Sequence, residues 1–447
     1  MTFPFRAEGP VEFSAPLPDE VDLIVIGGGV IGVSTALYAA RQGLRVVLLE
    51  KGRIAAEQSS RNWGWIRVQG RDMAEIPIAL ESQKLWQDLD AECLGRCGVK
   101  TVGVTYVGTS EDEMGRFQDW LDEAKPLGVS SYMMNAQETV RVMGEPHAPW
   151  IGALHTPTDM KGEPWVAVPE LARLAQHEGA VLIEDCAVRT LDRQAGRVTG
   201  VVTEQGRIKA DRVVLAGGVW SSLFLRRHGV SMPQLSVRST ALATHPLPDV
   251  FDGAAGEGRF ALRRRDDGGY TVAPGGFSEL FIGPDSFRAL KHYLPMVIKG
   301  GLKMVYHSKA PKGFPDAWDT PRSWTEDDET PFERMRVLDP EPARHKVQEL
   351  LGYFERFYPQ AGPVHAAKSW AGMIDVMPDI VPVVDTVSDL PGLTAVTGMC
   401  GHGFGIGPAF GKIAVALAME QDTGHDLSRF RLSRFTDGSK LVPGPSI

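Results

Sequence analysis

Short apolar runs of four to six residues recur along the chain, and several of them end in glycine-rich turns. The first run, VDLIVI at 21–26, has the length of a buried strand and precedes the turn GGGVIG. An apolar helix is expected through 33–40, and a second buried strand at 45–49. The order strand, turn, helix, strand predicts a β-α-β unit, and therefore an α/β fold built on a parallel sheet.

Two later segments show the same kind of pattern. Strands are expected at 181–184 and 213–216, with a hairpin-like meander between them. A further strand at 393–397 runs into a stretch with six glycines, 398–411, and then into an apolar helix. Pro408 is expected in the first turn of that helix, where its missing N–H is not needed.

The long interruptions between these segments contain shorter strand-like runs at 100–107, 236–244, 269–273 and 280–282. They predict an antiparallel roof domain, so the chain combines an α/β domain with an overall α+β arrangement. The predicted division is an arm of 1–20, a nucleotide-binding domain of 21–75, 150–228 and 366–430, a roof of 76–149 and 229–365, and a tail of 431–447.

Composition excludes several classes of protein. With 47 Lys+Arg against 56 Asp+Glu, the net charge of −9 argues against nucleic-acid binding. Four cysteines are too few for a disulfide framework in a chain of 447 residues, and no His/Cys set has metal-site spacing. The chain has neither an apolar run of membrane-spanning length nor a signal-peptide core, so a cytoplasmic protein is expected.

The first glycine turn predicts nucleotide binding. Gly27, Gly29 and Gly32 form G-x-G-x-x-G: a tight turn, close approach of a pyrophosphate, and close packing of helix on strand. Glu50, at the end of the second strand, is placed to accept the ribose hydroxyls of an adenosine. This unit alone does not separate NAD from FAD. The second glycine stretch favours a flavin, because a helix N-terminus there would offer amides to the negatively charged edge of a reduced flavin.

Taken in order, GGGVIG with Glu50, SSRNWGW at 59–65, VVLAGGVW at 213–220 and SWAGMIDVMPDIVPV at 369–383 resemble the D-amino-acid oxidase (DAO) family of FAD-dependent oxidoreductases. This family includes glycine oxidase, sarcosine oxidase and D-amino-acid dehydrogenase. The resemblance implies FAD on a discontinuous Rossmann-like domain, roofed by an antiparallel domain. It implies a non-covalent flavin, with Cys400 keeping a covalent link open as an alternative.

The resemblance also implies that the loop after the second strand runs beside the flavin ring, with Trp63 and Trp65 as walls. The expected cofactor-binding residues are Gly27, Gly29, Val30, Ile31, Gly32, Glu50, Lys51, Ser59, Ser60, Arg61, Asn62, Trp63, Gly64, Trp65, Val188, Ala216, Gly217, Trp220, Gly372, Met373, Gly401, His402, Gly403, Phe404, Gly405 and Ile406. The expected catalytic residues are Arg67, Tyr270, Asp375 and His402.

One departure from the family concerns the substrate. Where relatives carry G-x-R-P, with an arginine that clamps the substrate carboxylate, this chain has Ile374 and Asp375. Isoleucine cannot form a bidentate clamp. Either another cation, Arg67 or one of Arg263, Arg264 and Arg265, holds the carboxylate, or the substrate is a secondary or terminal amine whose carboxylate lies elsewhere.

The predicted reaction is oxidation of the C–N bond of an amino acid or secondary amine to an imine, by hydride transfer to flavin N5. The alternatives are C–O oxidation of a hydroxy acid or glycerol-phosphate-like substrate, an NAD-linked dehydrogenase and a non-catalytic flavin protein. Oxygen, a quinone or a protein is the expected electron acceptor. The absence of lysine from 278–283 favours a dehydrogenase over an oxidase.

The segment 287–312 carries six Lys/Arg and no acid in an acidic protein. Its apolar residues have helical spacing, which is typical of a segment that rests on the inner face of a membrane. An ordinary lid helix with a solvated face is the alternative, since proline and glycine interrupt the pattern.

Overall fold

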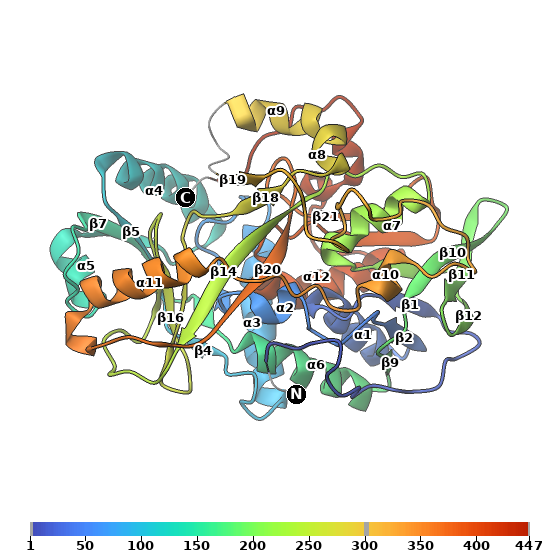
Figure 1. The fold of residues 1–447 in the computed structure, drawn as a ribbon, viewed down its shortest axis with the longest axis horizontal. Helices are drawn as coiled ribbons and strands as arrows, with labels where there is room; N and C mark the ends of the chain where they lie inside the picture. Colours follow the sequence, from blue (N-terminus) through green and yellow to red (C-terminus); the bar gives the residue numbers. More distant parts are fainter. Residues whose placement is uncertain (1–2, 299–303, 446–447) are drawn as a thin grey trace.

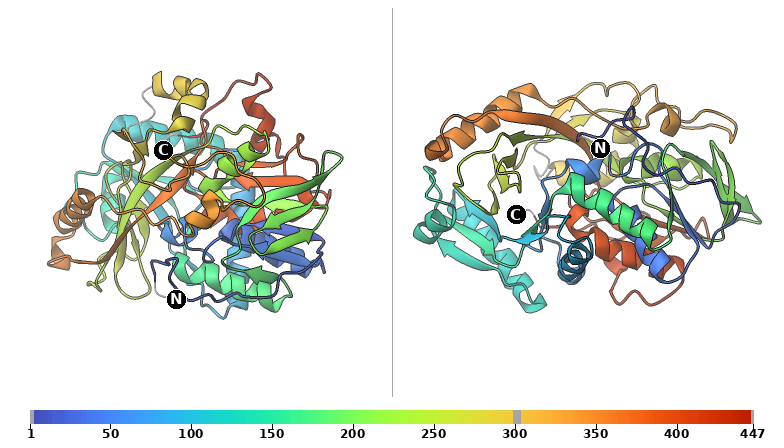
Figure 2. Two further views of the ribbon diagram at one scale, coloured as in Figure 1. Left: turned by 45° about the vertical axis from the view of Figure 1, so that its right-hand side comes forward. Right: turned by 90° about the horizontal axis from the view of Figure 1, so that it is seen from below.

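The computed structural model describes residues 3–298 and 304–445 of the chain. Two halves lie side by side, a nucleotide-binding half with a six-stranded sheet and a roof half with a ten-stranded sheet (Figure 1). Figure 2 shows these halves from two further directions. In the described part of the chain, no helix has both the length and the apolar character needed to cross a membrane.

The six-stranded sheet confirms the predicted α/β domain. Its order is β21-β22-β13-β1-β2-β9, and all neighbours are parallel except β21. The strands are β1 (Leu23–Ile26), β2 (Val46–Leu49), β9 (Val181–Ile183), β13 (Val213–Leu215), β21 (Val383–Thr386) and β22 (Leu393–Thr397). The parallel strands are short runs that are buried on both faces, as a sheet covered by helices requires, whereas the edge strand β21 ends in the half-buried Asp385 and the exposed Thr386.

Helices cover this sheet and connect its strands. They are α1 (Val30–Arg41), α2 (Gln58–Arg61), α3 (Ile76–Glu92), α6 (Pro164–His177), α7 (Ser221–Arg227) and α12 (Gly403–Ala418). A three-stranded meander, β10 (Val188–Gln194), β11 (Arg197–Thr203) and β12 (Gly206–Lys209), extends from the sheet as expected.

Helix α12 begins earlier than predicted, so the expectation for Pro408 is wrong. His402 is the N-cap and Pro408 lies inside the helix, where it removes the N–H that would bond the Phe404 carbonyl. The indole Nε1 of Trp86, on α3, donates to that carbonyl at 3.2 Å and replaces the lost bond. The glycines of the helix serve close packing: a Cβ at Gly407 would lie 2.6 Å from a methyl group of Val30 on α1.

The roof sheet has the order β19-β18-β14-β17-β16-β15-β5-β7-β6, with β20 paired to the other side of β14. Its strands are β5 (Val104–Gly108), β6 (Tyr132–Asn135), β7 (Gly152–Thr156), β14 (Leu235–Thr244), β15 (Ala254–Gly256), β16 (Ala261–Arg264), β17 (Tyr270–Ala273), β18 (Glu279–Phe281), β19 (Val305–His307) and β20 (Ala366–Val376). β14 and β20 are antiparallel over almost their full length and cross the centre of the molecule (Figure 1).

The single strand expected at 100–107 is divided in two. Gly103 has φ +73°, a left-handed conformation that breaks the extended run. The first part, β4 (Lys100–Thr101), joins a small sheet with β3 (Trp65–Ile66) and β8 (Met160–Lys161). The remaining helices are α4 (Glu111–Ala124), α5 (Ala136–Val142), α8 (Pro284–Arg288), α9 (Leu290–Ile298), α10 (Pro331–Arg334) and α11 (Arg344–Phe357).

Two segments pack differently from the predicted division of the chain. Phe3, in the N-terminal arm, is buried and stacks on Trp165 of α6 at 4.7 Å between ring centroids. Phe314 and Phe332, assigned to the roof, pack in the same core cluster as Trp220 of the nucleotide-binding half. The returning chain between these phenylalanines therefore covers the nucleotide-binding half.

Candidate active site

A cavity of about 390 Å³ runs from the glycine turn after β1, past α2, to the roof strand β20. Gly27 and Glu50 line its nucleotide end, and Trp65, Arg67 and Ile374 line its roof end. Both halves of the chain therefore contribute walls to one continuous space.

The glycine turn is shaped by backbone contact. Gly27 has φ +109°, and a Cβ there would lie 2.5 Å from the Ala216 carbonyl. A Cβ at Gly32 would lie 1.9 Å from the Gly27 carbonyl, so the helix reaches the strand only without a side chain. The turn places the N-terminus of α1 at the cavity wall through Gly29, Val30 and Ile31, which suits a pyrophosphate.

Glu50 stands at the end of β2, as predicted. Its carboxylate accepts hydrogen bonds from the amides of Gly28 at 2.7 Å and Gly52 at 2.8 Å. Removal of this carboxylate from bulk water raises the pKa of Glu50 to about 7, against the opposing charge of Lys51. The contact with a ribose stays a prediction.

The loop 59–65 does line the cavity, but its members differ in their roles. The Ser59 hydroxyl accepts the amide of Val30 at 2.8 Å, at the first turn of α1. Trp63 and Trp65 meet edge to face, with ring centroids 5.2 Å apart, and both line the cavity. They are positioned to wall a flat ring system.

Arg61 lines the cavity with its stem, whereas its guanidinium holds the protein together. It donates to the carbonyls of Ala56 and Ala371, at 2.9 and 2.8 Å, and pairs with Asp339 at 2.6 Å. Only 1% of the side chain is exposed. The Arg61 guanidinium therefore connects α2 to β20 and to the segment before α11.

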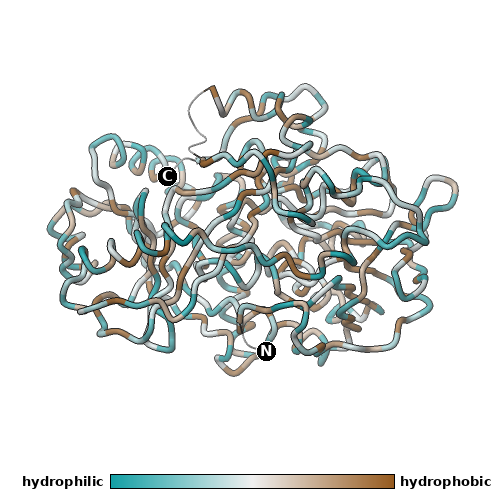
Figure 3. The backbone as a smooth tube through the Cα atoms, in the orientation of Figure 1, coloured by the Kyte–Doolittle hydropathy of each residue, from teal (hydrophilic) through white to brown (hydrophobic). Residues whose placement is uncertain are grey.

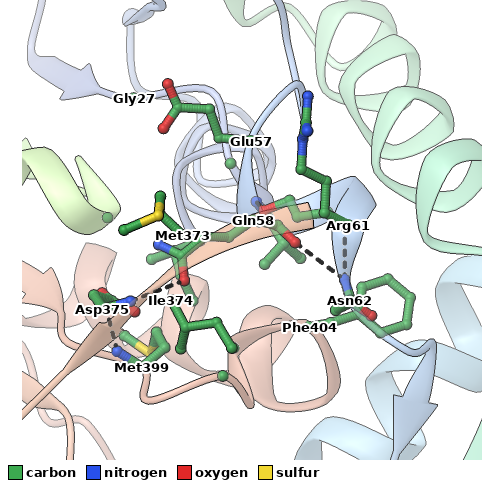
Figure 4. A pocket seen from close by; sticks show the side chains of 18 of the residues that line it. Gly27, Glu57, Gln58, Arg61, Asn62, Met373, Ile374, Asp375, Met399 and Phe404 are labelled. Carbon is green, nitrogen blue, oxygen red and sulfur yellow. Dashed lines mark hydrogen bonds between the residues drawn. The ribbon is translucent and has the colours of Figure 1, made fainter. Parts of the chain in front are cut away.

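Asp375 is fully buried and lines the cavity, and it holds a structural contact that the sequence did not indicate. One carboxylate oxygen accepts the amide of Gly398 at 2.8 Å. The same oxygen accepts the amide of Met399 at 3.2 Å, which Figure 4 marks with a dashed line. The other oxygen has no partner in the described part of the chain, and burial raises the pKa of Asp375. Asp375 thus anchors the glycine loop before α12 and also lines the cavity, so its contact with a substrate stays a prediction.

The predicted C-terminal cradle is formed by Gly401, His402, Gly403 and Phe404, which line the cavity. The other predicted cofactor residues that line it are Gly29, Val30, Ile31, Lys51, Asn62, Val188, Ala216, Gly217, Trp220, Gly372 and Met373. Those outside the lining are Gly32, Ser60, Gly64, Gly405 and Ile406. These five lie behind the wall, where close packing needs small or apolar side chains.

Two arginines stand at the roof end of the cavity, and the sequence analysis missed one of them. Arg71 is 5% exposed, and its guanidinium makes a single hydrogen bond to the described protein, from Nε to the Arg67 carbonyl at 3.4 Å. Burial and the neighbouring Arg67 lower the pKa of Arg71. Arg67 donates to the Gln69 carbonyl and lies over the ring of Tyr106, 5.2 Å from its centroid. Arg71 follows Arg67 by four residues in the same loop. Its place in a loop that was expected to run beside the flavin could have indicated it as a second cation of the site.

His402 also faces the roof end. Its Nε2 lies 3.2 Å from a carboxylate oxygen of the buried Glu75. Burial lowers the pKa of His402, whereas Glu75 opposes that change. The charges of Arg71 and Arg67 act in the same direction as burial and disfavour the charged form of His402.

Tyr270 was expected to meet the substrate, and this expectation is wrong. The residue is fully buried in the roof core and does not line the cavity. Its hydroxyl accepts the amides of Val250 and Phe251 at 3.1 and 3.2 Å. Its strand, β17, is buried along its whole length, so the side chain of Tyr270 points into the interior of the roof.

The roof arginines are likewise occupied. Arg263 is fully buried and pairs with Glu163 through two bonds of 2.8 and 3.1 Å. Arg265 pairs with Asp267, and Arg264 donates to the Leu247 carbonyl. None of the three lines the cavity, so Arg67 is the predicted cation that does.

The donor set suits a flavin dinucleotide. The glycine turn, Glu50, the tryptophan pair and the N-terminus of α12 face one continuous cavity, in the order expected for nucleotide and ring. Within residues 3–298 and 304–445, no group of three or more His, Cys, Asp or Glu side chains could hold a metal ion.

Comparisons with known proteins agree with this site. The family model DAO, FAD dependent oxidoreductase, matches residues 22–417. N-methyl-L-tryptophan oxidase of Salmonella arizonae is 25% identical over 93% of this chain and 99% of its own. Mitochondrial sarcosine dehydrogenase of Mus musculus is 28% identical over 58% of this chain, but the match spans only 30% of that longer protein.

Among solved structures, the L-amino acid deaminase of Proteus myxofaciens, in complex with anthranilate, has a TM-score of 0.89. It is 27% identical, and the alignment covers 95% of this chain and 96% of the deaminase. The predicted fold and the predicted FAD cofactor are confirmed. Because the family model covers most of its length, this chain belongs to the DAO family of FAD-dependent oxidoreductases.

Proposed function

We propose that this enzyme oxidises the C–N bond of an amino acid or an N-alkyl amino acid, whose carboxylate is held by Arg67 and Arg71. The observation that carries the proposal is the guanidinium of Arg71, which is buried at the cavity wall without an acidic partner among the described residues. An unpaired buried charge is unfavourable, and an anion that enters the cavity would relieve this.

A carboxylate is the anion that fits best. A guanidinium presents parallel N–H donors that match the two oxygens of a carboxylate. The nearby walls, Trp63, Trp65 and Ile374, are apolar and suit a substrate with an apolar side chain. Relatives named for N-methyl-L-tryptophan and L-amino acids support the same substrate class.

The protein's own contribution is orientation. With the carboxylate fixed at one end, the substrate carbon that bears nitrogen is held against the tryptophan-lined wall. FAD, when bound, supplies the two-electron acceptor that takes a hydride from that carbon at N5. The amine loses a proton to become an imine, and water then hydrolyses the imine.

The test is anaerobic reduction of the purified flavoprotein by matched pairs of compounds. Amino acids, N-methyl amino acids and the hydroxy acids of the same side chain are compared, together with the decarboxylated amines. Reduction by the first two groups alone is expected. Reduction by hydroxy acids would favour C–O chemistry, and equal reduction by decarboxylated amines would refute the carboxylate site.

We further propose a dehydrogenase that passes electrons to a quinone or a protein rather than to oxygen. The basis is the absence of lysine from 278–283. Reoxidation of the reduced enzyme by air and by a soluble quinone is compared in a stopped-flow instrument. Faster reoxidation by oxygen than by quinone would overturn this part of the proposal.

A peripheral contact with an anionic membrane surface at its inner face would bring such an acceptor close. Helix α9 presents Leu290, Leu294 and Ile298 at 50, 46 and 75% exposure, with Lys291 exposed beside them. Figure 3 shows much apolar colour on this helix at the edge of the molecule. Residues 299–303 of the basic segment lie outside the described residues. Co-sedimentation with vesicles that contain anionic lipid should fall for Leu294→Glu and stay unchanged for the control Leu94→Glu, at a distant exposed leucine.

A further inference from the structure

A buried carboxylate lies directly behind the two arginines of the site. Asp159, in the turn between β7 and β8, is fully buried. Its carboxylate accepts the amides of Val68 at 2.8 Å and Gln69 at 3.3 Å, and the side-chain amide of Gln83 at 2.8 Å. Three donors converge on one side chain that neither faces the cavity nor pairs with a surface cation.

The turn that carries Asp159 is itself fixed. The Asp159 carbonyl accepts the amides of Val102 at 3.2 Å and Gly103 at 2.9 Å. The carboxylate is thus a rigid point of attachment for the segment 67–71, which follows the short strand β3 and has no regular secondary structure.

Hydrogen bonds lead from this attachment to the guanidiniums. Asp159 holds the amide of Gln69, and the carbonyl of the same residue accepts a hydrogen bond from the guanidinium of Arg67. The Arg67 carbonyl accepts Nε of Arg71 at 3.4 Å. A shift of the segment would therefore move both arginines together.

The charge of Asp159 also stabilises the two arginines. Burial raises the pKa of Asp159 to about 6, while its amide donors and the charge of Arg67 oppose that rise. Asp159 and the buried Glu75 both favour the charged form of Arg71. The carboxylate thus offsets part of the repulsion between two guanidiniums that face one cavity.

We propose that Asp159 is the positioning residue of the anion subsite: it fixes the segment 67–71 so that Arg67 and Arg71 meet one substrate carboxylate. The proposal rests on the proposed function for the identity of that anion. It predicts that loss of the Asp159 carboxylate weakens substrate binding far more than it slows the chemical step.

The first test is Asp159→Asn in the FAD-loaded enzyme. Asparagine keeps one acceptor but turns its NH2 group either toward the Gln69 amide or, flipped, toward the Val68 amide and the Gln83 side-chain amide, so at least one N–H donor loses its acceptor. We expect KM for an amino-acid substrate to rise about tenfold to a hundredfold, as misplacement of a binding group does, with kcat within threefold. The dissociation constant of benzoate, followed by the flavin difference spectrum, should rise in parallel, and FAD affinity should not change.

The double variant Asp159→Asn, Gln83→Glu is the rescue. It exchanges donor and acceptor between the two side chains, and it should recover part of the lost benzoate affinity. Glu184→Gln is the matched control, since Glu184 is a buried carboxylate that likewise accepts three amides, of Glu12 at 2.7 Å, Phe13 at 3.3 Å and Ile54 at 2.7 Å, none of them in the segment 67–71. It should leave KM and benzoate affinity unchanged even where it lowers stability.

A milder variant keeps the test decisive if Asp159→Asn does not fold. Thr156→Val removes the 2.7 Å hydrogen bond from Thr156 to the side-chain oxygen of Gln69 and should raise KM and the dissociation constant of benzoate about threefold.

Unchanged benzoate binding in a folded variant, or an equal fall in benzoate and FAD binding, overturns the proposal. Failure of every amino acid to reduce the wild-type flavin would instead refute the proposed function, and benzoate binding would still test Asp159.

Discussion

Replacement of Arg71 by glutamine separates binding from folding, because the two effects have opposite signs. The guanidinium is 5% exposed and has no acidic partner in the described chain, so little solvent screens it. Loss of a bidentate, charge-assisted contact to a substrate carboxylate in such a place removes about 2–4 kcal/mol, with Arg67 retained, which corresponds to roughly 30- to 700-fold in affinity.

Stability should move in the other direction. An unpaired buried cation opposes folding of the substrate-free protein, so its neutral replacement should leave the free energy of unfolding unchanged or raise it by about 1–2 kcal/mol.

The assay is anaerobic stopped-flow reduction of the flavin at varied amino-acid concentration, with urea unfolding of the substrate-free protein alongside. The substrate dissociation constant should rise as calculated, while the limiting rate of reduction changes by less than about threefold. Arg265→Gln is the matched control: this arginine is 4% exposed and paired with Asp267, so its loss should lower stability and leave substrate affinity unchanged. An Arg71→Gln enzyme with wild-type affinity, or one that unfolds more easily, would refute the reasoning.

Three other measurements follow from the structure. The pKa of Glu50 is about 7, so protonation below that pH removes the charge that would accept ribose hydroxyls. The affinity for FAD, followed by the fluorescence of released FAD, should therefore fall as the pH drops through 7. The Glu50→Gln variant should bind FAD weakly at every pH. Arg61→Ala should lower the free energy of unfolding in urea by about 3–5 kcal/mol because it leaves buried acceptors unpaired, whereas Arg45→Ala, at an exposed ion pair, should change it by less than about 1 kcal/mol. Gly407→Ala should lower the free energy of unfolding by about 1–3 kcal/mol, because it overpacks α12 against α1, and should weaken FAD binding. Gly352→Ala, in open space on α11, should raise the free energy of unfolding by about 0.5–1 kcal/mol. Thermal unfolding of both variants measures the two changes.

The nucleotide-binding half was readable from the sequence because its signals are local. The strand at 393–397 and the turn at Gly27–Gly32 depend on apolar runs and on glycine geometry within a few residues. The order of these local units along the chain also carried the family resemblance. Fold class and cofactor were determined at this level.

The substrate end was decided only by tertiary structure. Pro408 lies inside its helix because a tryptophan from α3 replaces the lost hydrogen bond, and no local pattern records that contact. Tyr270 and Arg71 are both polar residues in or beside strand-like segments, but one points into the roof core and the other into the cavity. Asp159 reaches the segment 67–71 across about ninety residues of chain. Burial, pairing and direction of a side chain depend on which distant elements pack around it, so the sequence determined the scaffold and the cofactor, and the packing of the two halves determined which charges line the cavity.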